Sequence, residues 1–153
     1  MIKHFSDLNL CSALRNNLDK NEFVTPTPVQ AQAIPPLMEG RDVVATAQTG
    51  TGKTLAFSIP VIEALAAAPR TKTIKVLILS PTRELAIQID EAFRQLAHGM
   101  RIHTAVVVGG MSEPNQLRDI RAGAEVVIAT PGRLCDYLER RLIDLSRAAT
   151  VVL

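Results

Sequence analysis

The chain has 153 residues, the length of one ordinary domain or a large part of a bigger one, and 47% of them are hydrophobic, enough for a real core. A net charge of only +2 gives no global basic field, so any nucleic-acid site must be local. The sequence has no apolar signal-peptide core and no apolar run of ~18 residues that could span a membrane. Cys11 and Cys135 lie too far apart to form a typical metal-binding motif. These features favour a cytoplasmic protein that does not enter a membrane.

The N-terminal part of the chain predicts two helices joined by a stiff connection. Leucines at positions i, i+4 and i+8 indicate a helix over about 10–20. Pro26 and Pro28 then force an extended segment, and Pro28 suits the first position of a second helix, 28–38. The Pro35-Pro36 pair should bend or shorten that helix.

From residue 42 onward the sequence alternates between apolar runs and helix-like runs. Nearly continuous apolar strands separated by helices indicate an α/β fold, with a parallel sheet covered by helices on both faces. Pro60 predicts a kink in the first of these helices. The predicted strands are 42–46, 74–80, 103–108, 125–129 and 150–153, and the predicted helices are 53–67, 83–98, 113–122 and 132–141.

A phosphate-binding loop is predicted between strand 42–46 and helix 53–67, in the stretch Ala47-Gln48-Thr49-Gly50-Thr51-Gly52-Lys53-Thr54. Glycines let successive N–H groups of residues 49–52 point into one concavity that cradles phosphate oxygens, at the positive end of the following helix. Lys53 is expected to reach the β- and γ-phosphates, and the Thr54 hydroxyl to ligate Mg²⁺. The pattern departs from G-x-x-x-x-G-K-[ST] at its first position, which is Ala47.

Short motifs also follow three of the predicted strands. Ser80-Pro81-Thr82-Arg83-Glu84 follows the first, Gly109-Gly110 the second and Thr130-Pro131-Gly132-Arg133 the third. All fall at the carboxyl ends of parallel strands, where doubly wound folds bind ligands. With the Thr-Pro-Thr-Pro-Val-Gln segment and the phosphate loop, this ordered set resembles the DEAD-box RNA helicases over essentially the whole chain.

The resemblance implies an ATP site in which the N-terminal segment 1–38 reads adenine. Gln30 would pair its amide with the N6 and N7 edge of the base, Phe23 would stack on it, and Phe5 would pack behind the same site. The family usually has glycine at the position of Glu22, and Asn21 is expected to take the left-handed backbone instead.

The resemblance further implies that one RNA strand, single or within a duplex, is gripped along its sugar-phosphate backbone. Arginines and hydroxyls suit phosphates, and glycines let backbone amides approach closely. The residues implied are Pro81, Thr82, Arg83, Gly109, Gly110, Thr130, Gly132 and Arg133.

The family's architecture implies that 39–153 is a RecA-like P-loop domain that is incomplete at its C-terminus. In the family, the strand starting at Val151 runs into an Asp-Glu-Ala-Asp segment that holds Mg²⁺ through water and positions the attacking water. A second RecA-like domain supplies the arginines that stabilise the transition state. The chain by itself is therefore expected to lack hydrolysis, and strand 42–46 to lack its neighbours, which would make the isolated chain marginally stable or prone to aggregate.

Three functions are therefore compared. The favoured one is an ATP-dependent RNA helicase, of which these residues are the N-terminal part. A fragment that binds nucleotide or RNA without turnover is the second, and a P-loop kinase of small metabolites is the third, although no lid or arginine-lined substrate pocket is evident.

Overall fold

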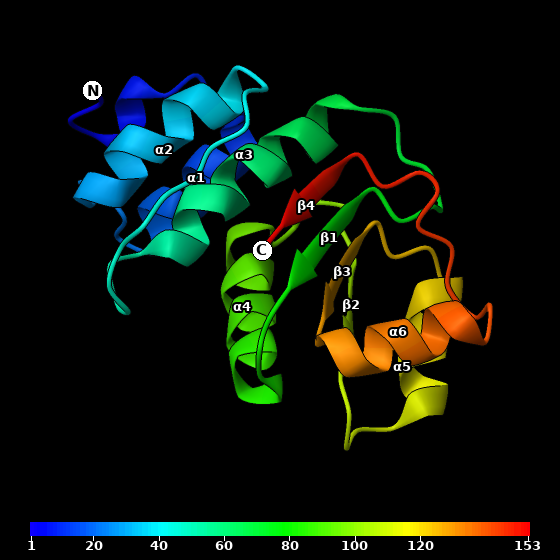
Figure 1. Cartoon of the computed structure of the whole chain (residues 1–153). Coiled ribbons are helices and arrows are strands. Elements are labelled where there is room, and N and C mark those ends of the chain that lie inside the picture. The colour runs from blue at the N-terminus through cyan, green and yellow to red at the C-terminus, as the bar shows by residue number, and fades with distance from the viewer. The chain divides into compact units, whose positions relative to one another are not determined.

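The computed structural model describes all 153 residues, which divide into two compact units. We call Met1–Pro69 with Ala92–Arg101 the helical unit, and Arg70–Glu91 with Ile102–Leu153 the sheet unit. Figure 1 shows the elements of both. The sequence predicts a different division, by function: an adenine-reading segment 1–38 and a partial RecA-like domain 39–153. That functional division stays a prediction. No helix combines the length and the apolar character needed to cross a membrane.

The helical unit packs its helices around a common apolar core. Leu14, Ile34, Ile59 and Phe93, from four different helices, are fully buried there. The predicted helices are confirmed within a few residues. Its elements are η1 (Phe5–Asp7), α1 (Ser12–Lys20), α2 (Pro28–Met38), α3 (Lys53–Ala67) and the end of α4 (Arg83–Leu96).

The two prolines at the end of α2 do not shorten it, so that part of the expectation is wrong, and a bend in the helix stays a prediction. Both lie inside the helix, which runs to Met38. A proline removes a donor but keeps its carbonyl, and the N–H of Glu39 donates to the carbonyls of Pro35 and Pro36, each at 3.2 Å. Pro60 likewise lies inside α3, where it is buried.

The sheet unit contains one four-stranded parallel sheet in the order β2-β3-β1-β4 (Figure 1). The predicted parallel sheet is thus confirmed. Leu79 aligns with Ala129, and Ala129 aligns with Val107, so β1, β3 and β2 end level with one another. The strands are β1 (Val76–Leu79), β2 (Thr104–Val107), β3 (Val126–Ala129) and β4 (Thr150–Val152), and the helices wholly within this unit are α5 (Glu113–Arg121) and α6 (Pro131–Glu139).

Helices cover both faces of this sheet, as the sequence predicts. On one face, Leu77 and Val127 pack in a core cluster with Leu117 of α5 and Tyr137 of α6. On the other face, the hydroxyl of Thr104 hydrogen-bonds to the carboxylate of Asp90, which lies in the part of α4 that belongs to this unit. Alternation of side chains along each strand separates the two cores.

The predicted strand 42–46 is wrong. Residues 41–48 form no helix or strand, and the side chain of Val44 is 97% exposed. Its β-branched composition favours an extended backbone, but a strand becomes stable only when its N–H and C=O groups pair with a neighbour. None of the four strands pairs with this segment.

The backbone before Phe23 also differs from the expectation. Glu22 itself adopts the left-handed conformation, with φ of +60°, whereas Asn21 has φ of −94°. The left-handed turn expected at Asn21 is therefore made one residue later, by Glu22. A left-handed backbone costs an ordinary L-residue roughly 1–2 kcal/mol, so Glu22 stores strain.

We predict that Glu22→Gly raises the free energy of unfolding by about 0.5–1 kcal/mol, because glycine relieves the strain but adds freedom to the unfolded chain. Urea unfolding followed by circular dichroism measures this change. Glu22→Ala is the matched control, since it removes the carboxylate and keeps the Cβ. Equal stabilities of the two variants would show that the positive φ carries no strain.

Candidate functional site

The predicted phosphate loop lies in the helical unit and leads into α3. Gly50 and Gly52 have φ of +84° and +86°, which ordinary residues avoid, and Gly52 is the N-cap of the helix. The loop thus ends at a helix N-terminus, where partial positive charge favours anions. Thr49 is exposed, whereas Thr54 in the first turn is half-buried.

Two side chains of the loop bond to its own backbone. The ammonium group of Lys53 donates to the carbonyl oxygen of Ala47 at 2.6 Å, which joins the two ends of the motif. The hydroxyl of Thr51 donates to the carbonyl of Gln48, also at 2.6 Å. These contacts hold the exposed loop in a compact turn, with the Lys53 cation beside it.

Helix α2 grips this loop through Thr27 and Gln30. The hydroxyl of Thr27 donates to the carbonyl of Thr51 at 2.7 Å, and Nε2 of Gln30 donates to the carbonyl of Gly52 at 3.0 Å. The Oε1 atom of Gln30 accepts from the N–H of Thr27 at 2.9 Å. A side chain at Gly52 would collide with the Gln30 amide, so this glycine is required twice, for its backbone and for its lack of Cβ.

The structure therefore gives Gln30 a contact that the sequence did not predict. Its side chain is only 4% exposed, and these two bonds use one amide hydrogen and one lone pair. An amide has two of each, so these two bonds leave one hydrogen and one lone pair of Gln30 unused. Phe23 is half-buried in the same unit, and Phe5 is buried at 4% exposure.

The three other motifs meet at one edge of the sheet in the sheet unit. Because β1, β2 and β3 end level, the residues after them start side by side. The N–H of Thr130 donates to the carbonyl of Val107 at 3.0 Å, which ties the ends of β3 and β2 together. The residues that lie in these three loops and the helix starts after them are Pro81, Thr82, Arg83, Gly109, Gly110, Thr130, Gly132 and Arg133.

Arg83 and Gly110 lie against each other. The guanidinium of Arg83 reaches so close to Gly110 that an added Cβ would lie 2.5 Å from Nη1, and Gly110 also has φ of +76°. Nothing lies within 4 Å of a Cβ added to Gly109. The hydroxyl of Thr82 accepts from the N–H of Leu85 at 3.1 Å and so caps the start of α4.

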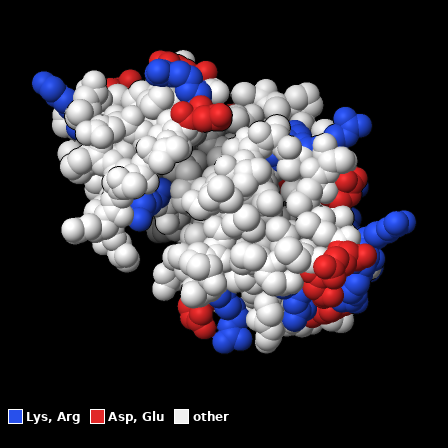
Figure 2. Space-filling view, in the orientation of Figure 1, with Lys and Arg blue, Asp and Glu red and all other residues white.

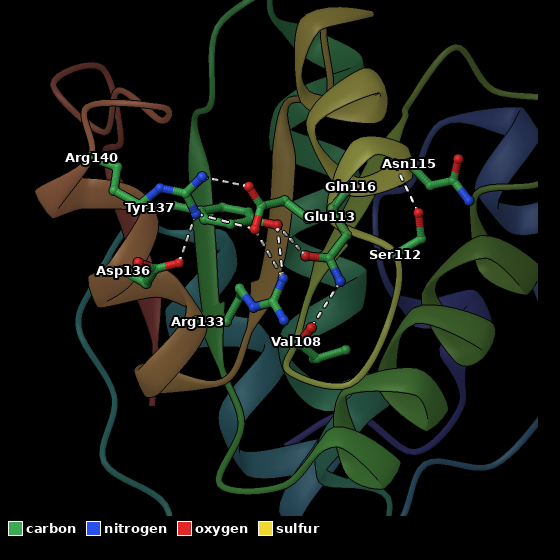
Figure 3. A network of polar contacts seen from close by, with 9 residues as sticks. All are labelled: Val108, Ser112, Glu113, Asn115, Gln116, Arg133, Asp136, Tyr137 and Arg140. Atoms are coloured by element: carbon green, nitrogen blue, oxygen red, sulfur yellow. Dashed lines mark hydrogen bonds and ion pairs between the residues drawn. The ribbon is translucent and has the colours of Figure 1, made fainter.

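Arg133 joins a polar network between α5 and α6 (Figure 3). Its guanidinium lies 5.6 Å from the ring centroid of Tyr137 and donates to the Tyr137 hydroxyl at 3.3 Å. That hydroxyl donates to Oε1 of Gln116 at 2.6 Å, and Nε2 of Gln116 donates to the carbonyl of Val108 at 2.8 Å. The network therefore connects the Thr-Pro-Gly-Arg motif to the residue before Gly109.

A carboxylate completes this network. Glu113, the first residue of α5, accepts from Arg140 and lies 3.6 Å from Nη1 of Arg133. The hydrogen bond from Arg140 is the main cause that lowers the pKa of Glu113, and the same bond raises the pKa of Arg140. Figure 2 shows acidic and basic side chains gathered together over α5 and α6 on the visible face.

The chain contains no group of three or more His, Cys, Asp or Glu side chains that could hold a metal ion. For the predicted Mg²⁺, the expected ligand in this loop is the hydroxyl of Thr54, whereas the hydroxyl of Thr51 is bonded to the carbonyl of Gln48. The Thr54 hydroxyl fits a magnesium ion whose other ligands are phosphate oxygens and water, the usual arrangement in nucleotide sites.

The family model described as DEAD/DEAH box helicase matches residues 27–153. The chain belongs to the DEAD/DEAH box helicase family. It is 45% identical over 135 residues to the ATP-dependent rRNA helicase RRP3 of Meyerozyma guilliermondii, covering 88% of this chain and 28% of that protein. It is 43% identical over 150 residues to the ATP-dependent RNA helicase DeaD of Escherichia coli, covering 97% and 24%. The chain thus spans about a quarter of the length of these curated relatives.

Solved structures agree with this assignment. A DEAD box protein from the hyperthermophile Methanococcus jannaschii matches with a TM-score of 0.89 and 33% identity, covering 97% of this chain and 40% of that one. A hypothetical ATP-dependent RNA helicase from Sulfolobus tokodaii matches with a TM-score of 0.84 and 35% identity, covering 94% and 40%. The predicted RecA-like family fold is therefore confirmed.

Several residues around the DEAD/DEAH box motifs escaped the sequence analysis. Gln116 and Tyr137 are buried polar side chains on helices. Burial of a polar side chain implies a hydrogen-bond partner, but the sequence does not show which residue that partner is. Glu113 and Arg140 look like ordinary surface charges in the sequence, because they bond to each other across 27 positions of the chain. In the sequence, Thr27 stands out only as part of the Thr-Pro-Thr-Pro segment.

We predict that Gly110→Ala lowers the free energy of unfolding by about 1–2 kcal/mol, because the backbone is left-handed and the methyl group displaces Arg83. Chemical denaturation measures the loss. Gly109→Ala is the matched control at the adjacent position and should change stability by less than about 0.5 kcal/mol. Equal losses at both positions would contradict a special role for the Arg83 contact.

Proposed function

We propose that these 153 residues form the nucleotide-binding and RNA-binding part of an ATP-dependent RNA helicase. The observation that carries the proposal is the meeting of the Pro81–Arg83, Gly109–Gly110 and Thr130–Arg133 loops at one edge of the sheet. Their cations, hydroxyls and glycines suit the sugar-phosphate backbone of RNA and give little preference for base sequence.

ATP is the proposed nucleotide, with Mg²⁺. The N–H groups of Thr49, Gly50, Thr51 and Gly52 would surround the phosphates, Lys53 would exchange the Ala47 carbonyl for phosphate oxygens, and Thr54 would ligate the metal ion. Phe23 would stack on the adenine. Gln30 would use its remaining hydrogen and lone pair on the base, while its contact with Gly52 keeps the loop in place.

ATP supplies the phosphoanhydride bond whose hydrolysis drives strand separation. Hydrolysis needs carboxylates that hold Mg²⁺ and orient the attacking water, and arginines that stabilise the transition state. The resemblance assigns these groups to an Asp-Glu-Ala-Asp segment and to a second RecA-like domain. For these 153 residues we propose binding of ATP and of RNA, and a cytoplasmic location remains a prediction.

Lys53→Ala is expected to weaken ATP binding by ~10–100-fold, because it removes the cation beside the phosphate loop. Titration with a fluorescent ATP analogue measures the dissociation constant. Lys20→Ala removes an equal charge from α1 and serves as the control, with unchanged affinity. Unaltered binding in Lys53→Ala would overturn the phosphate-loop assignment.

Gln30→Ala is expected to weaken both ATP and GTP binding, since the loop loses its bond to α2, and to weaken ATP binding more. The ratio of GTP to ATP dissociation constants should therefore fall by about fivefold, the value of one neutral hydrogen bond. Gln32→Ala, an exposed glutamine of the same helix, is the control. If both affinities fall by the same factor, Gln30 holds the loop and does not read the base.

A further inference from the structure

Glu113 interacts with two arginines, and its interaction with Arg140 is stronger than its interaction with Arg133. Arg140 donates to it twice, from Nη2 to Oε1 at 2.6 Å and from Nη1 to Oε2 at 3.1 Å. Arg133 approaches Oε2 to 3.6 Å, which is ion-pair distance without a good hydrogen bond. Glu113 is therefore held mainly by Arg140 and exerts a weaker attraction on Arg133 (Figure 3).

Arg133 keeps other contacts that do not depend on this carboxylate. Its guanidinium lies over the ring of Tyr137 and donates to the hydroxyl of that residue at 3.3 Å. Arg140 in turn has Asp136 as a second acceptor at 3.0 Å. An anion that draws Arg133 from Glu113 thus leaves the carboxylate paired with Arg140 and leaves Arg133 supported by Tyr137.

The local charges balance. Glu113 and Asp136 carry two negative charges against the two positive charges of Arg133 and Arg140. Glu113, like any glutamate with an ordinary pKa, is ionised at neutral pH, and its pKa is lowered further, first by the hydrogen bond from Arg140 and also by the charge of Arg133. A phosphate that approaches Arg133 therefore meets a cation that is already partly neutralised.

We propose that Glu113 is a built-in counterion of Arg133, which an RNA phosphate must displace, and that it thereby limits the strength of RNA binding. The proposal rests on the proposed function, because it takes Arg133 as a phosphate contact. Glu113 acts through Arg133 and does not touch RNA, so it is a positioning residue. In a protein that must also release its strand, this competition favours exchange over tight retention.

Glu113→Gln removes the charge and keeps the shape of the side chain. We expect it to tighten binding of a fluorescein-labelled single-stranded oligouridylate by about threefold, a value typical of one ion pair near the surface. Fluorescence anisotropy at low salt measures the dissociation constant. Asp119→Asn removes a carboxylate from the same helix and is the matched control for a general change of charge, with a smaller effect expected.

A double-mutant cycle with Arg133→Gln separates the two proposals. Arg133→Gln alone should weaken RNA binding, and in that background Glu113→Gln should have no further effect. If Arg133→Gln binds RNA like the unaltered chain, the proposed RNA contact of Arg133 fails. If Arg133→Gln weakens binding but Glu113→Gln does not tighten it, or tightens it equally in both backgrounds, only the counterion proposal fails.

A second measurement needs no RNA. Phenylglyoxal modifies arginine side chains, and mass spectrometry gives the rate at Arg133 relative to the exposed Arg101 of the same chain. Loss of the Glu113 charge should raise the relative rate at Arg133 by about threefold, since one ion pair is lost. An unchanged rate would overturn the counterion proposal whatever the RNA affinity, and a thermal melt verifies that both proteins are folded.

Discussion

The level ends of three parallel strands determine the geometry of the sheet unit. Leu79, Ala129 and Val107 lie in register across β1, β3 and β2, so the chain leaves all three strands at the same height. A shift of one residue would turn the side chains of a strand to the opposite face and expose its buried core residues. The apolar cores on both faces therefore also fix where the motif residues emerge.

Much of the fold follows from local sequence, and the failures have identifiable physical causes. Helices α2 and α3 begin and end where proline, glycine and apolar periodicity indicate. Segment 42–46 has the composition of a strand, but composition says nothing of whether a partner strand is available to it. Glu22 shows the same limit for a turn, because its neighbours impose a positive φ that its own preference opposes.

The sequence predicts the candidate site as a set of motifs but not as a set of contacts. Motif spacing identifies Lys53, Gln30 and Arg133 without revealing what each one touches. The bonds from Gln30 to Gly52 and from Arg140 to Glu113 span 22 and 27 positions of the chain. Such pairings arise from tertiary packing, and no local pattern encodes them. Buried polar residues such as Gln116 are the best sequence signal that a network exists.

The contact of Lys53 with residue 47 explains why the loop tolerates alanine at the first glycine position of the usual phosphate-loop pattern. Residue 47 serves through its carbonyl oxygen, which every amino acid possesses, and it is not among the residues with positive φ. Gly52, in contrast, has no room for a side chain. The two glycine positions of the pattern are thus under different constraints. A search that demands glycine at both would overlook proteins whose loop is built just as this one is.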